Sequence, residues 1–305
     1  MNTPDHFTIP HRRRDEIRVG VVFPQTEIGN VVSDIREFAV TTEAMGFTHL
    51  LAYDHVVGGS LEAHPNLQGR YTSETPFHEV FVLFGYLAAV TTSLELVSGV
   101  LILPQRQTTL VAKQAAELDL LSGGRLRLGV GIGWNDIEYQ ALNENFRNRG
   151  RRIEEQISVL RAFWAQDILT YEGTWHHINH AGVLPLPLQR PIPIWIGASA
   201  EVAVRRAARL ADGFFANGGL NEGMERQLTA LYEELAANGR TLEDFGLEAR
   251  ISIAQGTPDD WKRAFVAWQE KGISHLSFVT MGGRFQTVAE HLRALESAYK
   301  AIEGM

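Results

Sequence analysis

The chain has 305 residues, of which 45% are hydrophobic and 21% are charged, a composition typical of folded globular proteins and not of disordered or collagen-like ones. Its 28 Lys and Arg against 36 Asp and Glu give a formal charge of −8, so we expect no nucleic-acid partner, which would require a broad basic surface. Cysteine is absent, which excludes disulfides, thiolate zinc sites and cysteine nucleophiles. No apolar run reaches the roughly 18 residues of a membrane span, so we expect no membrane association and a cytoplasmic protein.

Predicted strands and helices alternate along the chain. Short apolar runs rich in β-branched residues predict strands at residues 17–23, 48–53, 94–101, 125–130, 192–196, 213–216, 247–254 and 275–280. A segment with apolar residues at helical spacing follows each strand, at residues 31–45, 78–90, 108–121, 149–165, 201–211, 221–238, 258–271 and 287–302. Strand–helix pairs in this order predict the α/β class and, within it, a closed (β/α)8 TIM barrel.

We expect the barrel to form a single domain over residues 17–305, after a flexible tail at residues 1–16. A TIM barrel needs about 250 residues, and the surplus is assigned to the tail, to a long loop at residues 56–76 and to an insertion at residues 168–190. Turn signals at residues 171–175 predict an extra hairpin in this insertion. An open doubly wound sheet is the alternative, but the turn after the first strand lacks the glycine fingerprint of dinucleotide-binding folds.

Candidate site residues are found where the strands end, because TIM-barrel sites lie at that end of the barrel. Asp54 and His55 follow the second strand, and a histidine there either exchanges a proton with a ligand near neutral pH or is hydrogen-bonded within its loop. Gly99 and Val100 end the third strand. A glycine in a strand marks a close approach of a ligand or packing against a bulky neighbour. His55 is the catalytic candidate.

Two further turns could hold a flat or phosphorylated ligand. Gly131 and Gly133 belong to a run of alternate glycines that ends at Trp134 and Asn135, and the glycine face leaves room for a flat ligand or for large core residues across the barrel. The turn after the fifth strand opens a helix whose free amides favour a phosphate, and it consists of Gly197, Ala198, Ser199, Ala200 and Glu201, with Ser199 as the expected N-cap.

Other motifs are weaker. Gly282, Gly283 and Arg284 after the eighth strand form a rival anion site, since barrel phosphates often bind there. His176 and His177 in the insertion do not predict a metal site, because neighbours on a strand face opposite sides and no carboxylate stands close by. The nucleophile turn of hydrolases, the zinc-protease His pair and the phosphate-binding loop are absent from the sequence.

Four segments together resemble one family, the bacterial luciferase-like flavin and deazaflavin oxidoreductases. The longest is Leu103–Asn135, which includes LDLLSGGRLRLGVGIGWN, and the others are Arg149–Glu155, Pro193–Ser199 and Arg206–Gly213. The resemblance extends over about residues 17–300. It implies a β/α barrel with an insertion before the fifth strand, in agreement with the pattern of elements.

The resemblance also implies how a cofactor binds. A flavin-type ring would lie across the barrel mouth, its phosphate near residues 197–201 and its pyrimidine edge near residues 131–135. A cis peptide at Gly99–Val100 would support the ring. Asp54 and His55 match positions beside the reactive edge, with His55 as proton donor or acceptor, and Phe23 and Arg284 are the expected substrate contacts.

The resemblance does not decide between two cofactors, coenzyme F420 and FMN. Members that use coenzyme F420 transfer a hydride to or from an organic substrate, whereas members that use FMN generally react with oxygen. The modest length and Gly99–Val100 favour F420, and FMN, with a two-component monooxygenase reaction, is the alternative. A cofactor-binding barrel without turnover is the third possibility. Trp134 stands where some F420-dependent sugar-phosphate dehydrogenases have a catalytic acid, so a sugar phosphate is not expected. The implied partners are a small-molecule substrate, a second copy in a homodimer and a flavin or F420 reductase.

Overall fold

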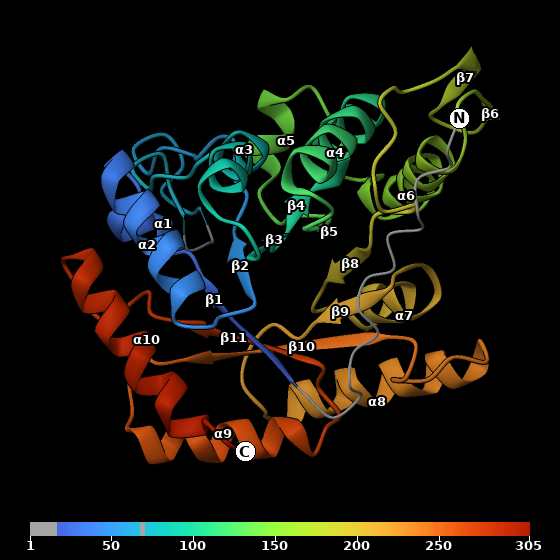
Figure 1. Ribbon diagram of the computed structural model, residues 1–305. Helices are drawn as coiled ribbons and strands as arrows, with labels where there is room; N and C mark the ends of the chain where they lie inside the picture. Colours follow the sequence, from blue (N-terminus) through green and yellow to red (C-terminus); the bar gives the residue numbers. More distant parts are fainter. Residues whose placement is uncertain (1–16, 68–70) are drawn as a thin grey trace, which may run out of the picture.

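A computed structural model describes residues 17–67 and 71–305, and the expected tail at residues 1–16 lies outside the described residues. Within them, the main sheet consists of parallel strands that run around the centre of the molecule (Figure 1). These strands are β1 (Arg18–Val22), β2 (His49–Ala52), β3 (Glu95–Ser98), β4 (Leu101–Ile102), β5 (Leu126–Gly131), β8 (Ile194–Gly197), β9 (Gly213–Phe215), β10 (Gly246–Ser252) and β11 (His275–Val279).

The sheet closes on itself into a barrel. Its strands follow the order β3-β2-β1-β11-β10-β9-β8-β5-β4, and β3 also pairs with β5, with Leu96 opposite Leu126 and Val97 opposite Arg127. β3 and β4 are two parts of the third barrel strand, which is interrupted at residues 99–100. The predicted TIM barrel is confirmed, and an open doubly wound sheet is excluded because its edge strands would not pair with each other.

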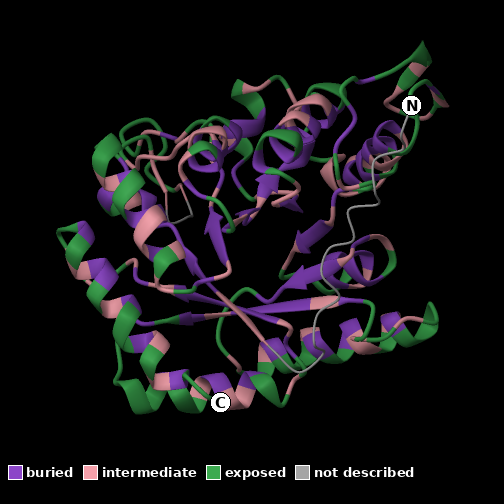
Figure 2. Ribbon diagram, viewed as in Figure 1, coloured by how far each residue is buried: buried purple, intermediate pink, exposed green. Residues whose placement is uncertain are grey.

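All the predicted helices are present, and their ends lie within two residues of the expected ones. They cover the outside of the barrel, with exposed residues on their outer faces and buried residues on the strands (Figures 1 and 2). They are α2 (Val32–Ala44), α3 (Val80–Val90), α4 (Thr108–Ser122), α6 (Arg149–Ala165), α7 (Glu201–Leu210), α8 (Glu222–Ala237), α9 (Pro258–Gln269) and α10 (Val288–Ile302).

Local sequence explains where several helices begin or end. Thr257 and Thr287 each form a capping box at the start of α9 and α10, in which side chain and backbone satisfy each other's donors. α4 ends at Gly123, whose φ of 71° is left-handed and suits glycine. Among the described residues, none of the helices is both long and apolar enough to cross a membrane.

The insertion before β8 contains the predicted hairpin, β6 (Leu169–Glu172) and β7 (His177–Ala181), whose strands are antiparallel. In Figure 1 it projects beyond α6 at the upper right. Glu155 of α6 fixes its turn by accepting hydrogen bonds from the backbone N–H groups of Thr174, Trp175 and His176 at 2.8–2.9 Å. Glu155 thus holds the hairpin turn to α6, and His176 Nε2 also lies 2.6 Å from Thr108 Oγ1 of α4.

A charged layer fills the barrel interior near the amino-terminal ends of the strands. Arg127 of β5 donates to Glu248 of β10 at 2.6 Å and to Glu95 of β3 at 3.1 Å, and its guanidinium carbon lies 4.4 Å from the Trp195 ring centroid. Burial opposes ionisation of Glu248, but Arg127 and His49 hold its pKa well below the ordinary value. This layer ties three strands together beneath the barrel mouth.

Candidate active site

Asp54, at the end of the second barrel strand, is only 2% exposed. Its Oδ2 accepts a hydrogen bond from the Ile102 N–H at 3.0 Å, and its Oδ1 accepts one from Arg106 at 2.8 Å. Arg106 also donates to Glu79 at 2.8 Å. Asp54 thus anchors the loop after β2 to the third strand and to the segment before α3, and it fixes the backbone from which His55 projects.

His55 lies in a corner lined by aromatic rings. Its ring centroid is 4.9 Å from that of Tyr71, 4.8 Å from that of Phe77 and 5.9 Å from that of Trp134. Its Nδ1 lies 3.4 Å from Oε2 of Glu138, and its side chain is 13% exposed. The histidine is therefore held on several sides and keeps limited access to solvent.

Glu138, on the short helix α5 (Asp136–Ala141), was not predicted from the sequence. Its carboxylate accepts hydrogen bonds from the N–H groups of Val56 at 2.5 Å and Val57 at 3.2 Å, and from Gln105 Nε2 at 3.0 Å. Burial raises the pKa of Glu138, but the hydrogen bonds from His55, Val56 and Gln105 outweigh burial and hold it below the ordinary value. An ionised Glu138 thus fixes both the loop after His55 and the ring itself.

The peptide bond Gly99–Val100 is cis, as the family resemblance implied. The glycines around it do not leave open space. A side chain at Gly129 would overlap the Ser98 backbone and the Phe215 ring, and one at Gly131 would lie 2.5 Å from a methyl group of Val100. The glycine face therefore admits large interior side chains, and Val100 and Phe215 form part of the floor of the barrel mouth.

The run that ends in Trp134 and Asn135 lies at the rim of the mouth. Trp134 is 40% exposed, whereas Asn135 is 2% exposed. Asn135 donates from Nδ2 to the Val57 carbonyl at 3.4 Å, and its buried Oδ1 has no hydrogen-bond partner in the part of the chain that the structure describes. Gly133 has a φ of 62°, which turns the chain between β5 and α5.

The turn at residues 197–201 leads into α7, whose N-cap is Ala200 and has no side-chain capping bond. The expectation that Ser199 caps this helix is wrong, because the helix begins one residue later. Glu201, the first helical residue, pairs with Arg205 at 2.9 Å, so its charge is largely compensated within the helix. This helix start therefore has no side-chain cap, and uncapped amides at a helix start favour an anion.

The rival turn after β11 is already engaged. The N–H of Gly282 donates to Glu27 Oε1 at 2.8 Å, and that of Gly283 donates to the Thr280 carbonyl at 3.1 Å. Arg284 is exposed and has a φ of 59°. A carboxylate thus takes one of the amides that a phosphate would need at this turn.

Two remaining expectations concern Phe23 and the histidines. Phe23 has no exposed surface and packs edge-on against Phe38 at a centroid distance of 5.6 Å, so it lies in the core.

The expectation that no carboxylate stands near the histidines is wrong. His176 Nδ1 lies 2.8 Å from Glu155, and His177 Nδ1 lies 2.8 Å from Glu172. His176 is largely buried whereas His177 is exposed, and no group of three or more possible metal ligands occurs within the described ranges.

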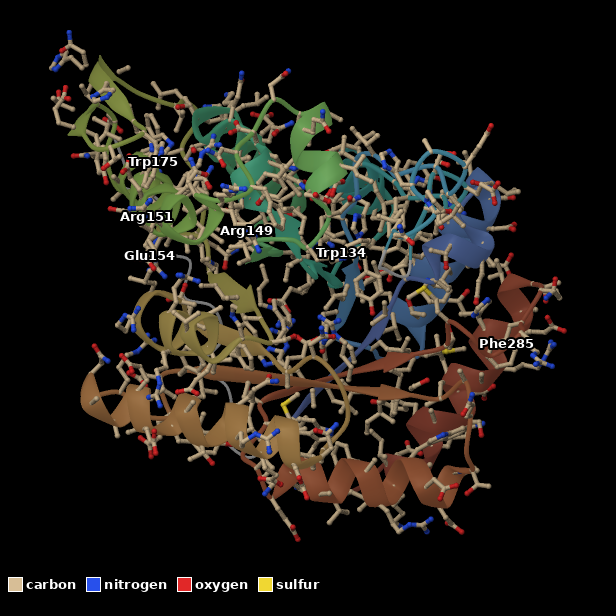
Figure 3. The ribbon with its side chains drawn as sticks, turned by 180° about the vertical axis from the view of Figure 1, so that it is seen from behind. Trp134, Arg149, Arg151, Glu154, Trp175 and Phe285 are labelled. Carbon is tan, nitrogen blue, oxygen red and sulfur yellow. The ribbon has the colours of Figure 1, made fainter. Side chains whose placement is uncertain are left out.

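Figure 3 shows how the labelled side chains are distributed over the molecule. Trp134 lies near the middle of the view, whereas Arg149 and Trp175 lie toward the insertion and Phe285 lies on the opposite side, beside α10. Arg149 stacks on Phe146 with its guanidinium carbon 3.5 Å from the ring centroid. The insertion and the turn after β11 therefore flank the mouth on different sides.

Comparison with known proteins adds the family. The model of the luciferase-like monooxygenase family matches residues 9–303. The chain belongs to this family. Family membership identifies it as an oxidoreductase.

Individual relatives of this luciferase-like chain use two different cofactors. An FMNH2-dependent dimethylsulfone monooxygenase of Pseudomonas fluorescens is 33% identical over 74% of this chain and 59% of its own. An F420-dependent glucose-6-phosphate dehydrogenase of Microbacterium testaceum is 30% identical over 73% of this chain and 64% of its own. The chain thus spans less than two thirds of both relatives. A solved F420-dependent secondary alcohol dehydrogenase is 14% identical, has a TM-score of 0.75, and the match covers 94% of this chain and 99% of that one.

Proposed function

We propose that this luciferase-like protein is an F420-dependent oxidoreductase that transfers a hydride between the deazaflavin and a small organic substrate. The observation that carries the proposal is His55, held by Glu138 and three aromatic rings at the carboxyl ends of the barrel strands. The fold of the F420-dependent alcohol dehydrogenase, matched along 99% of that chain with a TM-score of 0.75, supports F420.

The residues of the mouth fit a flavin-type ring. The buried Oδ1 of Asn135 lacks a donor, and the imide N–H at the pyrimidine edge of either cofactor could supply one. Val100 offers an apolar floor, and the start of α7 offers free amides to a phosphate. When bound, the ring would supply or accept the hydride. The part played by the protein is orientation, exclusion of water and control of one proton.

His55 is the group that we propose for this proton. Because Nδ1 faces Glu138, Nε2 is the nitrogen available to the substrate or the cofactor. Replacing His55 with Ala should lower turnover by about 100-fold or more, which is the usual contribution of a general acid or base, and leave cofactor affinity nearly unchanged. His177→Ala is the matched control, since His177 is exposed on the insertion hairpin. Full activity of a folded His55→Ala variant would show that the assignment is wrong.

An FMN-dependent, two-component monooxygenase is the second candidate, favoured by the 33% identity with the FMNH2-dependent relative. Titration of the apoprotein with F420 and with FMN, in both redox states, separates the candidates. We expect tighter binding of F420 and no oxygen consumption with the reduced coenzyme. Tight binding of reduced FMN with oxygen uptake would establish the monooxygenase instead. Tight binding without turnover over a broad panel of substrates would indicate a cofactor-binding barrel.

A further inference from the structure

Arg250 lies inside the barrel at the level of the mouth. It stands two residues after Glu248 on β10, so its side chain is on the same inward face but nearer the carboxyl end of the strand. Its guanidinium carbon is 5.4 Å from the ring centroid of Tyr53 and 5.7 Å from that of Phe215. Tyr53 directly follows β2 and Phe215 ends β9. Arg250 therefore reaches across the floor of the mouth between two aromatic faces.

This guanidinium has no counter-ion. Over residues 17–67 and 71–305, Arg250 forms no ion pair, and its buried Nε has no acceptor. The Nε atoms of Arg106 and Arg127 also lack an acceptor, but their terminal nitrogens are paired, Arg127 with Glu95 and Glu248, and Arg106 with Asp54 and Glu79. Arg250 is half-buried, with its Nε withdrawn from water, and a cationic group in such a place is normally paired or hydrogen-bonded. The missing partner of Arg250 is therefore expected to come from a ligand.

We propose that Arg250 is the anion-binding residue of the mouth and that its ligand is a planar oxyanion. The guanidinium presents parallel N–H donors that match a carboxylate in a bidentate manner. The rings of Tyr53 and Phe215 on either side favour a flat group over a bulky one. The same chemistry is offered by a substrate carboxylate and by the anionic carbonyl edge of a flavin-type ring. The inference rests on the proposed use of the mouth as the cofactor and substrate site.

The test measures binding to the apoprotein, so that it does not depend on turnover. Benzoate, acetate and inorganic phosphate are titrated into the wild type, Arg250→Met and Arg36→Met by calorimetry at low salt. Arg36 is exposed on α2 and serves as the control. We expect the wild type and Arg36→Met to bind benzoate alike and Arg250→Met to bind it at least about tenfold more weakly, the loss typical of one charged hydrogen-bonding partner. Arg250→Lys keeps the positive charge but not the parallel N–H donors, so its affinity for benzoate should be intermediate. It replaces Arg250→Met if the latter does not fold.

The two sources of the oxyanion are separated by titrating the same variants with F420 and FMN. Loss of benzoate binding with unchanged cofactor affinity assigns Arg250 to a substrate carboxylate. Weaker cofactor binding in Arg250→Met, without benzoate binding in the wild type, assigns it to the ring edge. A folded variant that binds all these ligands as the wild type does would overturn the proposal. An enzyme that binds benzoate through Arg250 but transfers no hydride would refute only the proposed function.

Discussion

Replacing Glu138 with Gln tests whether this carboxylate holds the catalytic corner together. A Gln side chain can still accept from the Val56 and Val57 N–H groups, but its amide nitrogen would face Gln105 Nε2 and His55 Nδ1, now at 3.0 and 3.4 Å from the carboxylate. Gln105 is 4% exposed, so water cannot replace the lost acceptor. Since a hydrogen bond to a charged group contributes about 1.5–3 kcal/mol, we expect the free energy of unfolding to fall by about 2–3 kcal/mol.

Urea denaturation and turnover of the same samples provide the assay. Glu155→Gln is the matched control, because Glu155 also accepts several backbone hydrogen bonds and contacts a histidine, but at the insertion hairpin. Both variants should be less stable, whereas only Glu138→Gln should lose turnover. Because the folded-state pKa of Glu138 lies below its ordinary value of 4.5, its ionisation stabilises the fold above that pH, and this contribution is lost as the pH falls through the folded value. Equal stability and equal turnover of Glu138→Gln and wild type would refute the reasoning.

Further predictions concern the barrel interior and the start of α7. Arg127→Met removes the buried cation that Glu95 and Glu248 share, leaving Glu95 with Arg18 and Glu248 with His49 and Ser277, and should cost about 3 kcal/mol. Calorimetry checks this, and a loss below about 1 kcal/mol would argue against the charged layer. Because the pKa of Glu248 is lowered in the fold, the free energy of unfolding of the wild type should fall as the solution is acidified. The free energy of unfolding of Glu248→Gln, measured over the same pH series, should depend less on pH. Ala200→Ser, which adds a capping hydroxyl at a bare N-cap, should raise stability by about 0.5–2 kcal/mol; an unchanged melting temperature would contradict it.

The architecture followed from local sequence because each strand and helix has its own pattern. Strand β5, whose residues are all buried, is a continuous apolar run apart from Arg127, as expected in a parallel sheet covered on both faces. The start of α7 shows the limit of such patterns, since helix ends are uncertain by a residue or two. The sequence favours Ser199 as the N-cap, but the N-cap is Ala200.

The pairing of site residues could be predicted only in part. His55 was identified from its place after a strand, but its partner Glu138 lies on a helix of six residues, too short for a periodic signal. Arg250 belongs to β10, Tyr53 follows β2 and Phe215 ends β9, and only the formation of the barrel brings them together. Burial and the lack of a counter-ion are properties of the folded molecule, and no spacing in the sequence encodes them.

The measurement that tests the account most directly is a crystal structure of the protein with F420 or FMN bound. We expect the ring to contact Val100, Asn135 and His55, and the amides at residues 197–201 to hold the phosphate. A ring bound away from His55, or a phosphate held at Gly282–Arg284, would contradict the central claim that the mouth beside His55 is the site of chemistry.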